Sequence, residues 1–138
     1  MTTVLLGQFR QASWGKRIRW VLSLVVGLYL MQLFVTNGWR KFDADGFWSA
    51  PFERWGYPSW FRILVGLIET GAGIGLVIPW VATYSGISLF IVMVGAFYTR
   101  WGSEFPSDLV WIAVWGTASL WIAFEWRSFL PFKRRLGD

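Results

Sequence analysis

The stretch that decides the fold is RILVGLIETGAGIGLVI, residues 62–78, an apolar segment with one acid, Glu69, at its middle. Nine of its residues are Ile, Leu or Val, and each favours membrane insertion by about 0.3 to 0.6 kcal/mol. A central charge costs about 2.5 to 3.5 kcal/mol on the same scale. The sum is near zero, so we expect this helix to lie inside a bundle, where Glu69 finds polar partners or is protonated.

The whole chain of 138 residues has the composition of a membrane protein. Apolar residues make up 55 % of it and charged residues 15 %, against about 25 % charged in an average soluble domain. A bilayer core about 30 Å thick needs roughly 20 helical residues. The uncharged runs hold four crossings, near residues 19–39, 60–79, 80–100 and 108–126. The sequence therefore predicts one all-α domain over residues 1–138, a bundle of four transmembrane helices.

Basic residues and tryptophans agree on the topology of this bundle. Eight of the 13 basic residues lie toward the two ends of the chain: Arg10, Lys16, Arg17, Arg19, Arg127, Lys133, Arg134 and Arg135. The positive-inside rule then puts both termini in the cytoplasm, which agrees with an even number of crossings. Tryptophans stand near the ends of every predicted span, where indoles prefer the membrane interfaces. A soluble, tryptophan-rich core is the alternative, but it would not explain why most basic residues lie toward the two ends of the chain.

The chain has no cysteine and no histidine, which limits its chemistry. It can form no disulfide and offers no cysteine or histidine ligand to an iron–sulfur cluster or haem. Zinc would have only carboxylate ligands, a poor set, so we assign no metal site. The net charge of +5 could suggest nucleic acid as a partner, but the basic residues flank apolar spans, so we predict none.

Glycines around Glu69 predict close helix packing. Gly66, Glu69 and Gly73 share one helix face at i, i+3 and i+7. Gly71 and Gly75 form a pair of small residues four apart on a neighbouring face, a spacing typical of packed membrane helices. For most of these glycines packing is the simplest role, and that role still places Glu69 in the interior.

The depth of Glu69 suggests its neighbours. It lies nine residues after Trp60, about 13.5 Å along a helix and thus near the midplane. Three polar side chains lie at similar depth when counted from the other tryptophans: Tyr29, Gln32 and Ser88. We predict a polar pocket in which Glu69, neutral or partly protonated, meets these three. An intramembrane acid is a functional candidate by default, and structural hydrogen bonding is the alternative.

A second polar region is expected at the outer mouth of the bundle. Four basic residues should gather there: Arg40, Lys41, Arg62 and Arg100. Ion pairing with nearby acids and snorkelling explain most of this pattern, and a basic rim that draws in an anionic or polar-headed ligand is the sharper alternative. Arg62 and Lys41 are poor partners for Glu69, because Arg62 lies about 10.5 Å above it and Lys41 near the outer helix end.

The loop between the first two predicted spans is the longest, and it is rich in aromatic residues. It includes Phe47, Trp48, Phe52 and Trp55. These side chains either anchor the loop at the membrane interface or fold over the mouth of the bundle, and long ordered loops of this kind are often functional.

Four motifs occur in an order that resembles a known family. GWRKF (38–42) ends the first predicted helix, WGYPSW (55–60) precedes the second, ETGAG (69–73) lies within the second and VMVGA (92–96) within the third. Together they resemble the DoxX family of small bacterial four-helix membrane proteins, over about residues 19–126. The chain departs from the family pattern at Ala72, which replaces the first of two glycines, and at residues 98–100, where many relatives carry a histidine.

The resemblance implies a multi-pass protein of the bacterial inner membrane with a quinone nearby, because the family's namesake belongs to terminal-oxidase and thiosulfate:quinone oxidoreductase systems. We expect a non-catalytic accessory subunit or assembly component of a larger electron-transfer complex. Such a subunit has no cofactor of its own, and its partner is a membrane protein or a second copy of the chain. The alternative is a quinone-binding subunit of a quinone-linked oxidoreductase that uses Glu69, with a bound quinone or lipid. We assign no catalytic residue.

Overall fold

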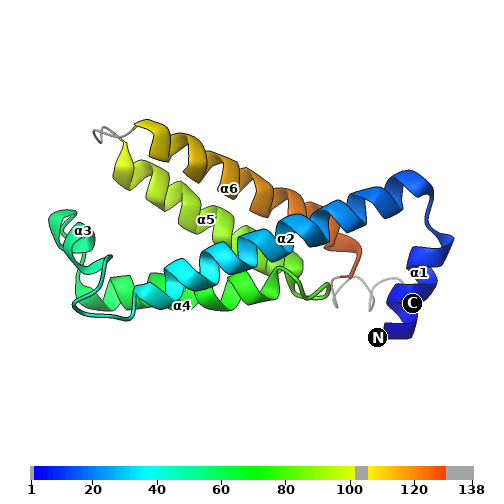
Figure 1. Ribbon diagram of the computed structural model, residues 1–138, viewed down its shortest axis with the longest axis horizontal. Helices are drawn as coiled ribbons and strands as arrows, with labels where there is room; N and C mark the ends of the chain where they lie inside the picture. Colours follow the sequence, from blue (N-terminus) through cyan, green and yellow to red (C-terminus); the bar gives the residue numbers. More distant parts are fainter. Residues whose placement is uncertain (1, 102–105, 130–138) are drawn as a thin grey trace.

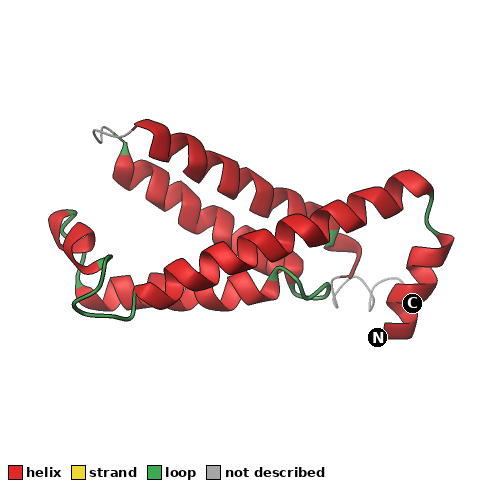
Figure 2. Cartoon of the chain, viewed as in Figure 1, coloured by secondary structure: helices red, strands yellow, loops and turns green. Residues whose placement is uncertain are grey.

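The computed structural model describes residues 2–101 and 106–129, and the regular structure within these ranges is all helical (Figures 1 and 2). The elements in chain order are α1 (Thr2–Gln11), α2 (Trp14–Arg40), α3 (Ser49–Arg54), α4 (Ser59–Gly75), α5 (Ala82–Arg100), α6 (Pro106–Glu125) and the 3-10 turn η1 (Arg127–Phe129). The all-α prediction is confirmed. Lys133, Arg134 and Arg135, which entered the topology argument, lie outside the described residues.

The four long helices pack as two pairs. The most extensive contacts join α5 to α6 and α2 to α4, and further contacts of α4 with α5 and of α2 with α6 hold the pairs together. Figure 1 shows the pairs crossing, with α3 at one end of the molecule and α1 at the other. We call these the α3 end and the α1 end.

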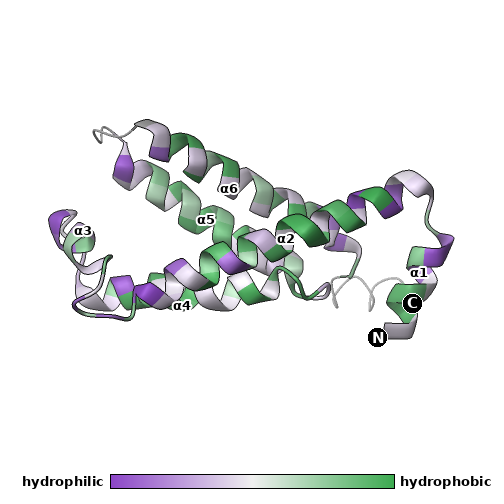
Figure 3. Ribbon diagram, in the orientation of Figure 1, coloured by the Kyte–Doolittle hydropathy of each residue, from purple (hydrophilic) through white to green (hydrophobic). Residues whose placement is uncertain are grey.

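Three of the long helices have the length and apolar composition to cross a membrane: Trp14–Arg40, Ala82–Arg100 and Ser107–Glu125. In Figure 3 apolar residues dominate the middle of each. The fourth long helix, α4, has 17 residues and is shorter than the predicted span over 60–79. It ends early because the backbone tightens after Gly75: Val77 N–H donates to Ile74 O and Ile78 N–H to Gly75 O, bonds that close a shorter turn than the α-helix.

Close backbone approach explains how α5 packs on α6. Gly86 of α5 is buried, and a Cβ added there would collide with Ser119 O and lie 2.8 Å from the Cβ of Ala123. One turn earlier, the Thr83 hydroxyl donates a hydrogen bond to Ala123 O at 2.8 Å. Small residues and hydrogen bonds between helices are what drive association in a bilayer, where apolar burial gives little.

We expect Gly86→Ala to lower the free energy of unfolding by about 1–3 kcal/mol, because the new Cβ meets the α6 backbone. Gly95→Ala in the same helix is the matched control, since a Cβ at Gly95 has no neighbouring atom within 4 Å. It should leave stability unchanged or raise it by up to about 1 kcal/mol. Denaturant titration in mild detergent, followed by tryptophan fluorescence, measures both, and equal losses would contradict the packing explanation.

Candidate functional site

Glu69 lies on the face of α4 that packs against α2, where it forms a buried ion pair. Its Oε2 accepts a hydrogen bond from Lys41 Nζ at 2.7 Å. The two side chains are 6 % and 5 % exposed, so the pair is well shielded from its surroundings. Lys41 is the C-cap residue of α2, and its Nζ also donates to Asn37 O at 3.5 Å. The pair therefore joins the end of one helix to the middle of another.

Two glycines set the register that makes this pair possible. A Cβ at Gly38 would lie 2.9 Å from both Gly66 O and Thr70 N, and a Cβ at Gly66 would lie 2.8 Å from Gly38 O. The backbones of α2 and α4 thus touch one turn from the ion pair. Close contact between glycines on facing helices is a common packing device in membranes.

The prediction that Lys41 is a poor partner for Glu69 was wrong, and the crossing of the two glycines explains why. Helix α2 ends at Arg40, just beyond Gly38, whereas α4 starts at Ser59, seven residues before Gly66, or about 10.5 Å away. Helix α4 therefore begins farther out than α2 ends. Tryptophans near these two ends do not mark the same depth, and Lys41 lies closer to Glu69 than the count implied.

The structure does not bring Tyr29, Gln32 and Ser88 to Glu69. The buried stripe of α2 consists of Trp20, Ser23, Gly27, Leu30, Phe34 and Gly38. Tyr29 and Gln32 fall outside it and are exposed, Tyr29 by 54 %. The Ser88 hydroxyl donates to Tyr84 O within its own helix at 2.8 Å. Tyr29 and Gln32 also lie well away from Glu69 along α2, because it is Gly38 that faces Thr70, the residue after Glu69.

The loop between α2 and α4 covers the ion pair with an aromatic ring. Lys41 Nζ lies 4.1 Å from the centre of the Trp48 ring, a cation–π geometry. The Arg100 guanidinium carbon at the end of α5 lies 5.9 Å from the centre of the same ring and 5.5 Å from that of Trp55. Two of the aromatic residues of this loop differ: Trp48 folds over the mouth of the bundle, whereas Phe47 is exposed.

Three of the four residues of the predicted basic rim have partners of their own. Lys41 is paired with Glu69, and Arg100 forms an ion pair with Asp108 of α6. Arg62 is buried, and its Nη1 donates to Asp43 O at 2.8 Å, which ties the loop to α4. Arg40 is exposed. The rim thus brings Lys41 and Arg100 to one tryptophan ring, and sequence reasoning had named that ring only as part of an aromatic loop.

The glycines of α4 divide between two environments. Gly66, Gly73 and Gly75 are buried; a Cβ at Gly73 would lie 3.1 Å from the Cβ of Phe34 in α2, and one at Gly75 would collide with Ser85 of α5. Gly71 is exposed, and a Cβ there would have no neighbouring atom within 4 Å. The face that carries Glu69 is therefore the packed face, and Gly71 lies outside it.

The ion pair links α2 to α4. Two buried polar atoms in the same region have no hydrogen-bond partner among the described residues. Lysine carries three N–H donors, and Lys41 directs its charge to the Glu69 carboxylate, Asn37 O and the Trp48 ring. Within the described part of the chain, Trp48 Nε1 and Thr70 Oγ1 are buried and have no hydrogen-bond partner. Trp48 covers Lys41, and Thr70 Oγ1 faces Gly38 in the contact between α2 and α4.

Comparison with known families assigns the chain. The model of the DoxX-like family matches residues 25–123, a range that includes most of α2 and α6, all of α4 and α5, and the whole Lys41–Glu69 site. No curated protein and no solved structure matches the chain at significant similarity. The match covers well over half of the sequence and reaches into all four long helices, and the chain therefore belongs to the DoxX-like family.

Proposed function

We propose that this protein spans the bacterial inner membrane four times, with both termini in the cytoplasm, and serves as a non-catalytic accessory subunit or assembly component of a larger electron-transfer complex. The match to the DoxX-like family and three apolar helices of sufficient length support the membrane setting. The full sequence has no cysteine or histidine to ligate a redox metal, which favours a partner as the source of any electron transfer.

The outward face of α4 supports a fourth crossing. After the exposed Ser59 at its start, its exposed side chains are Trp60, Ile63, Leu64, Leu67 and Ile74, all apolar. Its 17 residues span about 25 Å, slightly less than the hydrocarbon core, and short spans are accommodated by local thinning or by flanking residues. The start of α2 and the end of α6 line one pocket and so lie at the same end of the molecule, as an even number of crossings requires.

One observation carries the accessory role: the acid at the centre of α4 is neutralised within the chain. A lone intramembrane carboxylate would mark a proton or ligand path by default. Here Glu69 is held by Lys41 at 2.7 Å, and both side chains are buried. The pair fixes α2 to α4 under Trp48, so its first effect is to define the shape of a scaffold.

Mild-detergent extraction from native membranes, followed by native mass spectrometry of the intact species, tests this role. We expect a second membrane protein at fixed stoichiometry. A tagged, unrelated four-span protein from the same membranes controls for chance co-extraction. A chain recovered only alone or as a homo-oligomer would refute the accessory role.

A quinone-binding subunit is the second candidate, and the two unpartnered polar atoms favour it. A quinone head group carries carbonyl acceptors. The Trp48 N–H is a buried donor beside Lys41, and the Thr70 hydroxyl is a buried donor between α2 and α4. Solvent extraction and mass spectrometry of the purified protein would detect a bound quinone. Trp48→Phe keeps the ring over Lys41 but removes the N–H, so it should reduce quinone occupancy, whereas unchanged occupancy would exclude Trp48 as a donor to the head group.

A further inference from the structure

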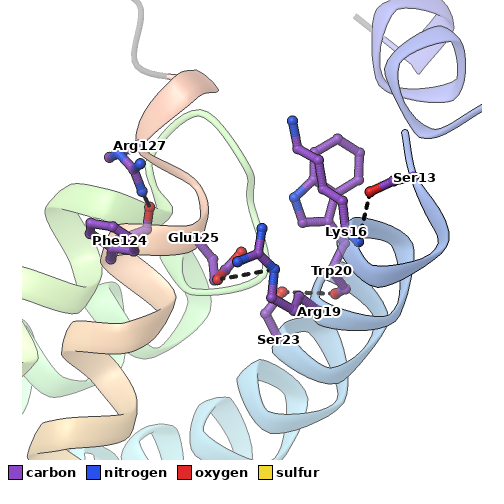
Figure 4. A network of polar contacts seen from close by, with 8 residues as sticks. All are labelled: Ser13, Lys16, Arg19, Trp20, Ser23, Phe124, Glu125 and Arg127. Atoms are coloured by element: carbon purple, nitrogen blue, oxygen red, sulfur yellow. Dashed lines mark hydrogen bonds and ion pairs between the residues drawn. The ribbon is translucent and has the colours of Figure 1, made fainter. Parts of the chain in front are cut away.

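A pocket lies at the α1 end of the molecule, between the start of α2 and the end of α6 (Figure 4). Its volume is about 310 Å³, and its lining includes Lys16, Arg19 and Trp20 from α2 and Phe124, Glu125 and Arg127 from the end of α6 and the turn after it. It is remote from the Lys41–Glu69 site, which lies toward the α3 end.

The pocket carries an excess of positive charge. Its one carboxylate, Glu125, has a side chain only 7 % exposed and lies 3.9 Å from Arg19 Nε. That pair leaves Lys16 and Arg127, and within the described residues neither lies within 4 Å of a carboxylate. Three cations against one anion leave a net charge of +2 in the pocket, which favours an anionic ligand.

The neighbouring Arg17 has a structural role, in contrast to Lys16 and Arg127, because its guanidinium hydrogen-bonds to two backbone carbonyls of α1. Its Nε donates to Phe9 O at 2.9 Å, and its Nη2 donates to Arg10 O, so the guanidinium fastens α1 to the start of α2. Lys16 instead extends along Trp20, with its Nζ 5.1 Å from the ring centre. Arg127 makes one hydrogen bond to Phe124 O and rests on the Phe124 ring, which leaves most of its five donors for a ligand.

The wall of the pocket is built in advance of any ligand. Trp20 is buried and stacks on Trp126 at 5.8 Å and on Phe9 at 6.2 Å between ring centres. The Ser23 hydroxyl donates to Trp20 O at 2.7 Å, as Figure 4 shows. A wall fixed by packing lowers the entropy that binding would otherwise cost.

We propose that this pocket binds the phosphodiester head group of an anionic phospholipid. Phosphate oxygens are matched by arginine and lysine donors, and basic pockets between transmembrane helices bind anionic head groups. A lipid is favoured over free phosphate because apolar side chains continue from the pocket along both helices. Leu22 of α2, one turn after Arg19, and Leu120 of α6, one turn before Phe124, are exposed, so an acyl chain can lie against them while the phosphate sits in the pocket.

Native mass spectrometry of the full chain, titrated with phosphatidylglycerol or phosphatidylcholine, tests the proposal. We expect tighter binding of phosphatidylglycerol and a loss of about fivefold for each removed charge in the double variant Lys16→Gln, Arg127→Gln. Arg40→Gln, Arg54→Gln is the matched control, because both residues are exposed at the α3 end and the change in net charge is equal. Equal affinity for the two lipids, or equal losses in both double variants, overturns the proposal.

Two further arms separate the possible explanations. Glu125→Gln removes the one negative charge of the pocket, so it should strengthen phosphatidylglycerol binding by about fivefold, a gain that misfolding cannot produce. Millimolar inorganic phosphate should not displace the lipid. Displacement by phosphate alone would show that the pocket takes the free anion and that the acyl chains contribute nothing, which overturns the lipid assignment.

Discussion

Glu69→Ala is expected to lower the free energy of unfolding by about 3–5 kcal/mol, the usual cost of removing one partner from a buried ion pair. The variant leaves the Lys41 ammonium buried, with Asn37 O and the Trp48 ring as its remaining partners among the described residues. A cation without its anion in an apolar interior is far more costly than the loss of a surface contact. Denaturant titration in mild detergent, with tryptophan fluorescence as the signal, measures the change.

The double variant Lys41→Met, Glu69→Leu shows whether the loss comes from an unpaired charge. Apolar residues of similar volume can replace a buried pair with little loss, or with a gain in stability. We therefore expect each single variant to be strongly destabilised and the double variant to return close to the starting stability. Losses that simply add would contradict the pairing. A stable double variant that no longer co-purifies with a partner would give the pair a role beyond the scaffold.

The positions of the long helices were predictable because the bilayer imposes a length. Each uncharged run had to be about 20 residues long, and the predicted spans over 19–39, 80–100 and 108–126 correspond to α2, α5 and α6. The predicted span that corresponds to α4 was too long. Residues 76–78 are as apolar as the helix before them, so their composition does not reveal the tight turn that follows Gly75. Apolar composition identifies a span but not the residue at which its hydrogen bonding changes.

The partner of Glu69 could not be predicted from depth alone. Depth fixes a position along the membrane normal, but the direction of a side chain depends on the rotation of its helix. In a soluble helix the polar face reveals that rotation; in a bilayer both faces are apolar, because lipid tails are as apolar as leucine. Tyr29 therefore failed in direction. It also failed in depth, because Glu69 lies near the level of Gly38, nine residues farther along α2. The informative signal was Gly38, whose bare backbone faces Gly66 and sets the offset of α2 against α4.

That contact leads to the second large effect: Gly66→Leu should cost about 3 kcal/mol or more, at the upper end of the range for overpacking. Even the first carbon of a new side chain would lie 2.8 Å from Gly38 O and 3.0 Å from the Cβ of Lys41. Backbone cannot rotate aside as a side chain can, so α2 must move away from α4 and the Lys41–Glu69 distance must grow. Gly71→Leu in the same helix is the matched control, because Gly71 is exposed and a Cβ there is free of contacts.

A distance measurement shows whether Gly66→Leu separates α2 from α4 or only destabilises α4 itself. The chain has no cysteine, so spin labels can be placed at Trp39→Cys and Leu67→Cys, two exposed positions on α2 and α4. If the glycine contact holds the helices together, Gly66→Leu lengthens the distance between the labels and Gly71→Leu leaves it unchanged. A distance unchanged in both, with stability lost only in Gly66→Leu, would mean that the strain is absorbed within α4. In that case the ion pair, and not the glycine contact, would set the spacing of the two helices.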